Sequence, residues 1–296
     1  MAYTSEPWVE PPIQAVHEAV RRALEEDVLP IGDLSAALVA ESARARFAFV
    51  SRRDGVVAGS RCAIEAFAVC DPRVEVDWLR PDASRVSAGD QLALVGGPLA
   101  PILTAERTAL NFLCHLSGIA TLTRSFVDAV RAVSPETRVL DTRKTTPGLR
   151  ALEKAAVRAG GGTNHRGSLS EAVLVKDNHL AGVAITDAVA TARRRWPGRM
   201  VEVECESLEQ VIEATDAGAS VVMLDNMKPA QVAECVALIA SKGAAGRVLV
   251  EVSGGVTIDT APEFAIAGAD LISVGALTHL APVLDIGLDL LSKGAS

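Results

Sequence analysis

Alternating strands and helices are clearest in residues 201–255, VEVECESLEQVIEATDAGASVVMLDNMKPAQVAECVALIASKGAAGRVLVEVSGG. Short runs rich in Val and Leu, at 201–204, 221–225 and 248–255, are typical of buried strands. The segments between them, 207–218 and 228–243, have helical periodicity, and Ser207 with Gln210 has the form of a capping box. Strands that alternate with helices of this length predict parallel βαβ units.

The same alternation continues outside this stretch. We expect further strands at 138–144, 172–177 and 271–276, and further helices at 186–196 and 257–269. Nearly every one of these strands ends in a polar or charged residue, and in a (β/α) barrel such ends converge on one mouth. An open doubly wound sheet would instead gather ligands mainly at its switch point. The pattern therefore predicts an α/β fold and favours a barrel over an open sheet.

The N-terminal part of the chain has a different character. A helical stripe at 13–27 is followed by short apolar runs from 46 to 90 that read as a small mixed β region. A helix is expected at 105–115, a break at Ser117–Gly118, and a second helix to Val133. The tail at 285–291 alternates like a strand and could return to the N-terminal region. The predicted domains are 1–117 plus 277–296, and 118–276.

Composition excludes several classes of protein. The net charge of −8 argues against a nucleic-acid binder or a protein bound to anionic membranes. The five cysteines are scattered without a C-x-x-C pair, which favours reduced, buried thiols over a zinc site. The N-terminus has no apolar core of a signal peptide, and no run approaches the roughly 18 apolar residues of a spanning helix. A cytoplasmic location is expected by elimination.

Basic residues are densest in residues 141–180, DTRKTTPGLRALEKAAVRAGGGTNHRGSLSEAVLVKDNHL. Three of them are four residues apart and are expected to form a solvated helix face: Arg150, Lys154 and Arg158. The others lie at the ends of strands or in a glycine-rich loop: Arg143, Lys144, His165, Arg166 and Lys176. Converging guanidinium and ammonium groups suit a substrate that carries several carboxylates or phosphates.

Carboxylates follow the next two strands. Asp225 ends one strand, while Glu202 and Glu204 lie on the same side of the preceding one, so the pattern does not choose between these two. Such carboxylates can hold Mg²⁺, stabilise positive charge on a sugar, or form salt bridges with the lysines. Glycine-containing turns end the last two strands, at Ser253–Gly254–Gly255 and Val274–Gly275–Ala276. Barrel enzymes frequently bind phosphate there, with a contribution from the following helix N-terminus.

The ordered set of motifs resembles the quinolinate phosphoribosyltransferase family. It comprises TAERTALNFLCHLSGIAT at 104–121, the basic block, EVE at 202–204, MLDNM at 223–227, EVSGG at 251–255 and ISVGALTH at 272–279. EEDVLPIGDLS at 25–35 extends the resemblance almost to the start of the chain. The resemblance implies phosphoribosyl transfer from 5-phosphoribosyl-1-pyrophosphate to quinolinate with loss of CO₂, in the presence of Mg²⁺. It also implies an N-terminal α/β sandwich domain, an incomplete barrel and a homodimer with shared active sites.

The resemblance also implies roles for individual residues. Thr142, Arg143, Lys144, His165, Arg166 and Lys176 are expected to bind the quinolinate carboxylates and phosphates. Arg107 is similar to the arginine given across the dimer interface to the partner's quinolinate. Glu204 and Asp225 are expected near ribose and metal, and the two glycine turns at phosphate. We expect Lys144 and Lys176 to act electrostatically, without a covalent intermediate.

Several other functions remain open at this stage. A paralogue encoded beside molybdate transporters, or a non-carboxylating nicotinate phosphoribosyltransferase, would share the fold and pocket. A Schiff-base aldolase would use Lys176 as its nucleophile, and a non-catalytic protein would bind a phosphorylated ligand without turnover. The set of Arg107, Arg143, His165, Arg166 and Lys176 fits a dicarboxylate substrate better than these alternatives.

Overall fold

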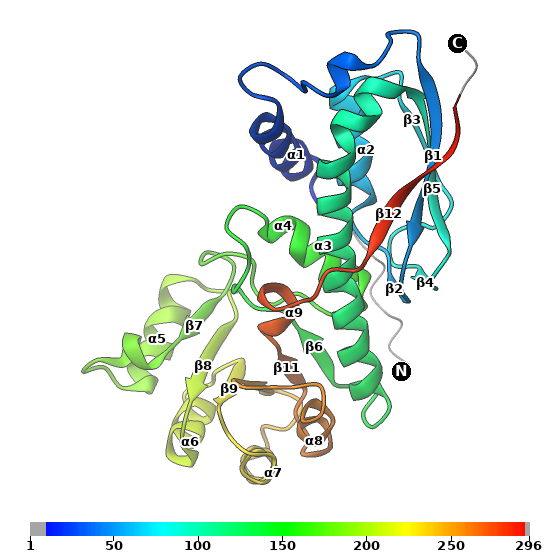
Figure 1. Ribbon diagram of the computed structural model, residues 1–296. Coiled ribbons are helices and arrows are strands. Elements are labelled where there is room, and N and C mark those ends of the chain that lie inside the picture. Colours follow the sequence, from blue (N-terminus) through cyan, green and yellow to red (C-terminus); the bar gives the residue numbers. More distant parts are fainter. Residues whose placement is uncertain (1–9, 294–296) are drawn as a thin grey trace. The chain divides into compact units, whose positions relative to one another are not determined.

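The computed structural model describes residues 10–293, which form two compact units (Figure 1). One unit contains residues 125–144 and 162–276 and is called the barrel unit here. The other begins before α1, continues to Arg124, and includes residues 145–161 and the chain from Leu277 onward; it is called the sheet unit. No helix within residues 10–293 is long and apolar enough to cross a membrane.

The barrel unit contains one six-stranded sheet in which every paired strand is parallel. Its strands are β6 (Arg138–Leu140), β7 (Val173–Val175), β8 (Val201–Cys205), β9 (Val221–Asp225), β10 (Leu249–Ser253) and β11 (Leu271–Ser273). In the order β6-β11-β10-β9-β8-β7, strands β7 to β11 are neighbours in the order in which they follow one another in the chain. The first strand of the unit, β6, lies beside the last, β11. This cyclic order is that of a barrel. Since β6 and β7 are not paired among the described strands, the barrel is incomplete.

Helices lie between consecutive strands, as the alternation predicts. They are α5 (Ile185–Arg195), α6 (Leu208–Asp216), α7 (Pro229–Ser241) and α8 (Ala261–Ile266), with a 3₁₀ turn, η2 (Asp177–Leu180), after β7. At the start of α6 the hydroxyl of Ser207 accepts a hydrogen bond from the backbone N–H of Gln210 at 3.3 Å. The capping residue therefore begins the helix where the sequence predicts it.

Strand register places polar residues of the barrel unit on one face. Glu204 pairs with Met223, and Asp225 pairs with Ser253. Glu251 pairs with Met223 as well, from the other side of β9. Since partners in register share a face and side chains alternate along a strand, Glu202, Glu204, Asp225, Glu251 and Ser253 all point to the same side of the sheet.

The sheet unit contains a four-stranded antiparallel sheet of order β12-β1-β5-β3. Its strands are β1 (Arg44–Ser51), β3 (Glu75–Trp78), β5 (Gln91–Pro98) and β12 (Ile286–Lys293), and β2 (Gly55–Val56) pairs with β4 (Arg85–Val86). Helices α1 (Ile13–Val28) and α2 (Ser60–Cys70) and a short turn η1 (Ala36–Leu38) belong to the same unit. The predicted return of the tail is confirmed, because β12 pairs with β1 along its length.

The predicted break at Ser117–Gly118 is wrong, because α3 (Leu99–Arg131) runs through both residues. The Ser117 hydroxyl accepts a hydrogen bond from the backbone N–H of Ala58 and donates one to its carbonyl, each at 3.0 Å. A Cβ on Gly118 would lie 2.1 Å from the carbonyl oxygen of Pro282. Here small residues mark close packing inside a helix and do not mark its end.

The basic face expected at Arg150, Lys154 and Arg158 is also not a solvated one. These residues belong to α4 (Arg150–Ala159), in the sheet unit, where Lys154 is only 6% exposed. A Cβ on Gly160, which caps α4, would lie 2.5 Å from the carbonyl oxygen of Ala120 in α3. The close approach of α4 to α3 explains why a helix with charged residues at this spacing is largely buried.

The short helix α9 (Ala276–His279) follows β11.

Candidate active site

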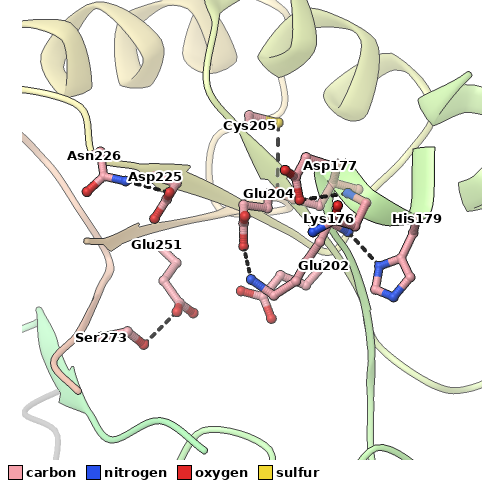
Figure 2. A network of polar contacts seen from close by, with 12 residues as sticks. Lys176, Asp177, His179, Glu202, Glu204, Cys205, Asp225, Asn226, Glu251 and Ser273 are labelled. Atoms are coloured by element: carbon pink, nitrogen blue, oxygen red, sulfur yellow. Dashed lines mark hydrogen bonds and ion pairs between the residues drawn. The ribbon is translucent and has the colours of Figure 1, made fainter. Parts of the chain in front are cut away.

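Neighbouring strand ends position the predicted lysine and carboxylates. Val175 at the end of β7 pairs with Val203, so that Lys176 comes beside Glu204. The ammonium group of Lys176 forms an ion pair with the Glu204 carboxylate, and Figure 2 shows the two side chains directed toward each other. The Lys176 side chain is 42% exposed and that of Glu204 is 11% exposed. The pair therefore joins an accessible cation to a mostly buried anion.

Asp225 lies beside this pair, at the end of β9. Burial raises the pKa of Asp225, and the Glu204 carboxylate raises it further, while Lys176 and Lys144 act in the opposite direction. Asn226 donates a side-chain hydrogen bond to Asp225 at 2.7 Å. Two carboxylates that repel each other at adjacent strand ends favour a bound cation between or beside them.

The first glycine turn packs directly on Asn226. The backbone N–H of Asn226 donates to the carbonyl of Ser253 at 3.0 Å. Gly254 has φ +88°, and a Cβ on it would lie 2.3 Å from Oδ1 of Asn226. Glycine is required at this position by both backbone conformation and space. The following helix α8 begins only at Ala261, so a helix N-terminus does not directly follow this turn.

The second turn, Val274–Gly275–Ala276, follows β11. Val274 is buried, and its backbone N–H donates to the carbonyl of Leu140 in β6 at 2.9 Å. Gly275 and Ala276 are partly exposed. The turn is thus held to β6, with its last two residues accessible at the same end of the barrel as Ser253.

Thr142, Arg143 and Lys144 follow the end of β6. The Thr142 hydroxyl accepts a hydrogen bond from the backbone N–H of Lys144 at 3.0 Å, which turns the chain at this point. Nε of Arg143 is buried and donates no hydrogen bond to the described residues. A buried guanidinium donor without a protein acceptor is suited to an anionic ligand.

The loop with His165 and Arg166 is anchored to the end of β6 through Asp141. The buried Asp141 carboxylate accepts hydrogen bonds from the backbone N–H of His165 at 2.9 Å and from the side chain of Asn164 at 2.6 Å. Arg166 donates to the carbonyl of Ala172 at 2.9 Å. Burial lowers the pKa of the Arg166 guanidinium, and the nearby Arg143 guanidinium lowers it further. Two arginines are therefore held close together against their mutual repulsion.

Two buried glutamates contact His165, and the sequence analysis did not single them out for this role. Nε2 of His165 lies 3.0 Å from the carboxylate of Glu202 and 3.6 Å from that of Glu251. Glu202 is 3% exposed and Glu251 is 1% exposed. The sequence signal for this role was the presence of glutamate between valines in two strands, VEVE and VLVEV. A carboxylate that is buried in such a strand needs a partner. Glu204 and Glu202 thus have different neighbours, Lys176 and His165.

Arg107 lies in the sheet unit, on α3, with an exposed side chain. The threonines on either side of it along the helix are anchored: Thr104 donates to Asp33 at 3.0 Å and Thr108 to Asp27 at 3.1 Å. These contacts hold one face of α3 against the unit. Arg107 remains accessible from solvent.

The barrel unit therefore combines three kinds of group at one end of its sheet. Cations come from the end of β6, the loop at 163–166 and the end of β7; carboxylates come from β8 and β9; glycine turns follow β10 and β11. The arrangement is suited to a substrate with several negative charges and to a reaction in which positive charge develops near a carboxylate.

Comparisons with known proteins agree over nearly the whole chain. Residues 33–117 match the family described as "Quinolinate phosphoribosyl transferase, N-terminal domain", and residues 119–289 match its C-terminal domain. The chain is 42% identical over 283 residues to "Nicotinate-nucleotide pyrophosphorylase [carboxylating]" of Mycobacterium leprae, covering 93% of this chain and 97% of that protein. The Homo sapiens protein of the same name is 38% identical over 260 residues, covering 87% of this chain and 86% of its own.

A solved structure gives the same result. The structure of the nicotinate-nucleotide pyrophosphorylase from Francisella tularensis has a TM-score of 0.90 to this chain at 35% sequence identity. The match covers 97% of this chain and 100% of that one. The relatives and the solved structure are thus similar to this chain in length, sequence and fold.

Proposed function

Because the chain belongs to the quinolinate phosphoribosyltransferase family, we propose how its residues divide the work of that reaction. The reaction joins quinolinate to the ribose of 5-phosphoribosyl-1-pyrophosphate and yields nicotinate mononucleotide, pyrophosphate and CO₂, a step of NAD biosynthesis. The observation that carries the assignment of residues is the buried Arg143 donor beside Arg166, at the same barrel end as the Lys176–Glu204 pair.

The two carboxylates of quinolinate bind the cations of the barrel unit. Arg143 and Arg166 offer planar, multiply donating groups that match a carboxylate, while Lys144, His165 and Lys176 add donors around it. Arg107 of a second subunit completes the site in a homodimer. Thr142 supports the chain turn that places Arg143 and Lys144.

The phosphate groups of the second substrate bind the two glycine turns. Gly254 and Gly255 both have positive φ, a backbone conformation that favours glycine and that is used in turns whose N–H groups bind anions. Ser253 and Val274 are fixed by backbone hydrogen bonds to Asn226 and Leu140, so the turns are formed before the ligand arrives.

The residues at the ends of β8 and β9 fit Mg²⁺. Glu204 and Asp225 would supply hard oxygen ligands, and a divalent cation would relieve the electrostatic repulsion between them, which adds to the effect of burial in raising the pKa of Asp225. Mg²⁺ bound there with the substrate would neutralise charge on the departing pyrophosphate. The carboxylates themselves lie where positive charge develops on the ribose ring.

The bond changes follow from these positions. The pyridine nitrogen forms a bond to ribose C1 while the bond from C1 to pyrophosphate breaks, and the leaving group takes the electron pair. Glu204 and Asp225 stabilise the positive charge on the sugar. When the adjacent C–CO₂ bond breaks, its electron pair stays on the ring carbon, where the positive charge of the neighbouring pyridinium nitrogen stabilises it, and that carbon takes up a proton. Lys144 and Lys176 hold the carboxylates electrostatically and form no covalent bond.

The decisive assay supplies quinolinate, 5-phosphoribosyl-1-pyrophosphate and Mg²⁺ and measures nicotinate mononucleotide and CO₂. Arg143→Ala should lower kcat/KM by about tenfold to a hundredfold, since charged hydrogen bonds contribute about 1.5–3 kcal/mol. Arg247→Ala is the matched control, because Arg247 is exposed and donates to the carbonyl of Gly243. Reaction of nicotinate in place of quinolinate would refute the substrate assignment.

Shared active sites can be tested by mixing two inactive variants. Arg107→Ala removes the residue given to the partner, and Lys176→Ala removes a residue of the chain's own barrel. Mixed dimers would contain one site with neither change, so part of the activity should return. No recovery under conditions that exchange subunits would refute the shared site.

We also propose a cytoplasmic location and the sequence-domain division 1–117 plus 277–296 and 118–276, which groups residues 118–124 and 145–161 with the barrel segment although they belong to the compact sheet unit. All five cysteines are free thiols, which is the state that a reducing compartment such as the cytosol maintains. Fractionation of cells that express the full chain checks the location, and limited proteolysis checks the division.

A further inference from the structure

A fully buried carboxylate of the sheet unit has no part in the proposed reaction. Glu153 lies on α4 with its side chain 0% exposed, and Nε2 of His115, on α3, lies 2.9 Å from its Oε1. The other oxygen, Oε2, accepts a hydrogen bond from the backbone N–H of Thr146 at 3.1 Å. One oxygen of the carboxylate therefore joins two helices, and the other holds the turn that precedes α4.

This turn comes directly after two of the proposed substrate-binding cations. Arg143 and Lys144 end a segment of the barrel unit, and the chain enters the sheet unit at Thr145. The Thr145 hydroxyl accepts a hydrogen bond from Nε of Arg150 at 3.0 Å, and the next residue along the chain donates to Glu153. The two residues that follow Lys144 are thus both bound to the start of α4.

The turn is also closed by a hydrogen bond of its own. The backbone N–H of Leu149 donates to the carbonyl of Thr146 at 3.0 Å. Pro147 restricts the backbone of the turn and of the residue before it. Thr146, Pro147 and Gly148 are exposed, whereas the carboxylate that binds the first of them is fully buried. Because the turn is closed internally, the bond from Thr146 to Glu153 fixes the whole turn on α4.

Packing of α3 against α4 does not by itself account for a carboxylate at this position. Burying a carboxylate with an imidazole costs desolvation free energy, and well-packed apolar side chains of similar volume often join two helices as well or better. An apolar side chain cannot accept the hydrogen bond from Thr146. What Glu153 adds to packing is therefore its contact with the turn, and His115 supplies the second partner that a buried carboxylate needs.

We propose that Glu153 and His115 are positioning residues for quinolinate binding. They fix the chain directly after Arg143 and Lys144 and so limit the conformations that are open to these two cations. They act through that chain and do not touch the substrate. The inference rests on the proposed function for the identity of the substrate, and it adds one residue of α3 and one of α4 to those on which quinolinate binding depends.

Glu153→Ala removes the acceptor for the turn and tests the proposal by kinetics. Arg143 and Lys144 hold a substrate carboxylate in the bound state and during the reaction alike, so their misplacement should raise KM for quinolinate about tenfold and change kcat by less than about threefold. KM for 5-phosphoribosyl-1-pyrophosphate should change by less than about twofold. If Glu153 only stabilised the fold, the variant would lose active protein, which lowers kcat and leaves both KM values unchanged.

Two further variants separate the turn from packing. Glu153→Gln keeps the shape of the side chain, and its amide can accept from Thr146 and donate to His115, so KM for quinolinate should return to within about threefold of the wild-type value. Glu65→Ala is the matched control, because Glu65 on α2 is paired with His17 on α1 at 2.5 Å in the same unit. Loss of this other pair should leave KM for quinolinate unchanged.

Hydrogen exchange measures the position of the turn in the full chain without substrate. A peptide that spans residues 142–149 reports the Thr146 amide, which should exchange at least about tenfold faster in Glu153→Ala than in the wild type and nearly at the wild-type rate in Glu153→Gln. Circular dichroism shows whether each variant is folded. If Glu153→Ala does not fold, His115→Ala takes its place, because it removes one partner of the carboxylate from a partly exposed position and should change KM and exchange in the same direction.

Failure of this inference and failure of the proposed function give different results. If the wild-type chain does not convert quinolinate, the proposed function is wrong, while hydrogen exchange still tests the hold of Glu153 on the turn. The positioning role is overturned if the wild type is active and the folded Glu153→Ala or His115→Ala variant keeps its KM for quinolinate. It is equally overturned if Glu65→Ala raises that KM as much.

Discussion

Asn226 and Gly254 show how a single contact builds the predicted phosphate turn. Asn226 is one of two non-glycine residues with positive φ among the described residues, at +56°, and its side chain both donates to Asp225 and lies against Gly254. The turn after β10 is therefore coupled to the carboxylate at the end of β9. A sugar phosphate bound at this turn and a metal ion bound at Asp225 would therefore contact residues that are directly connected to each other.

A methyl group at Gly254 should disrupt that structure. Gly254→Ala places a Cβ 2.3 Å from Oδ1 of Asn226 at a φ of +88°, which strains the backbone by about 1–2 kcal/mol and displaces Asn226. We expect KM for 5-phosphoribosyl-1-pyrophosphate to rise about tenfold or more, with a smaller effect on quinolinate. Gly255→Ala separates backbone strain from the contact with Asn226, since Gly255 has φ +60° but no atom would lie within 4 Å of an added Cβ. Equal kinetics for both variants would show that contact with Asn226 is unimportant.

Glu251 should make stability depend on pH. Its pKa is raised to about 8 in the folded protein from an ordinary value of 4.5, so the folded state keeps a proton that the unfolded chain releases. This contribution is fully present below pH 4.5 and is lost as pH rises toward 8, by at most about 1.4 kcal/mol per pH unit. Glu251→Gln should flatten that decline in urea unfolding from pH 5 to 8. An unchanged slope would mean that Glu251 is ionised in the folded protein.

At the scale of elements, α3 is the clearest example of packing that overrides a local signal. Ser and Gly in succession predict a helix break because both compete poorly for helical structure. In the structure the hydroxyl of Ser117 is used by Ala58, and the missing side chain of Gly118 admits the Pro282 carbonyl. Both residues serve contacts with segments far away in the sequence.

Gly118→Ala should therefore destabilise the sheet unit strongly. The added Cβ would lie 2.1 Å from a carbonyl oxygen, and overpacking of this kind costs about 1–3 kcal/mol or more. Gly96→Ala is the matched control, because its Cβ would meet nothing closer than 3.7 Å. Thermal unfolding should give a lower Tm for the first variant and a nearly unchanged Tm for the second. Similar values for the two would contradict close packing at Gly118.

At the scale of the whole molecule, the chain leaves and re-enters each unit. After Lys144 it contributes residues 145–161 to the sheet unit, and after Ala276 it returns there to form β12. The sheet unit is thus completed only when the last strand has paired with β1. Neither unit consists of a single continuous segment of sequence.

The proposed shared site requires a dimer in solution. Light scattering on the purified chain should give a mass of about twice 30.9 kDa, since closed two-fold assemblies are the commonest soluble oligomers. The measurement should be made at the concentrations used for the activity assay. A fully active protein of single-chain mass would rule out the role proposed for Arg107 in a partner's site.

The sequence by itself determined the α/β class and the positions of the six barrel strands along the chain, and it indicated a barrel and the return of the tail. These features depend on local periodicity: β9 has the predicted bounds, 221–225, and α6 starts at the predicted cap. The polar residues at strand ends were also predictable, because parallel strands bring their carboxyl ends together. The family followed from long ordered motifs, which no local pattern explains.

Only the tertiary structure decided which side chains are neighbours. Alternation along β8 puts Glu202 and Glu204 on one face without distinguishing them, and their partners, His165 and Lys176, come from other segments. Burial of Lys154 and continuity of α3 at Gly118 depend likewise on surfaces distant in sequence. The physical reason is that periodicity records which side of an element is buried, whereas contact partners, pKa shifts and tolerated volumes depend on what packs against that side.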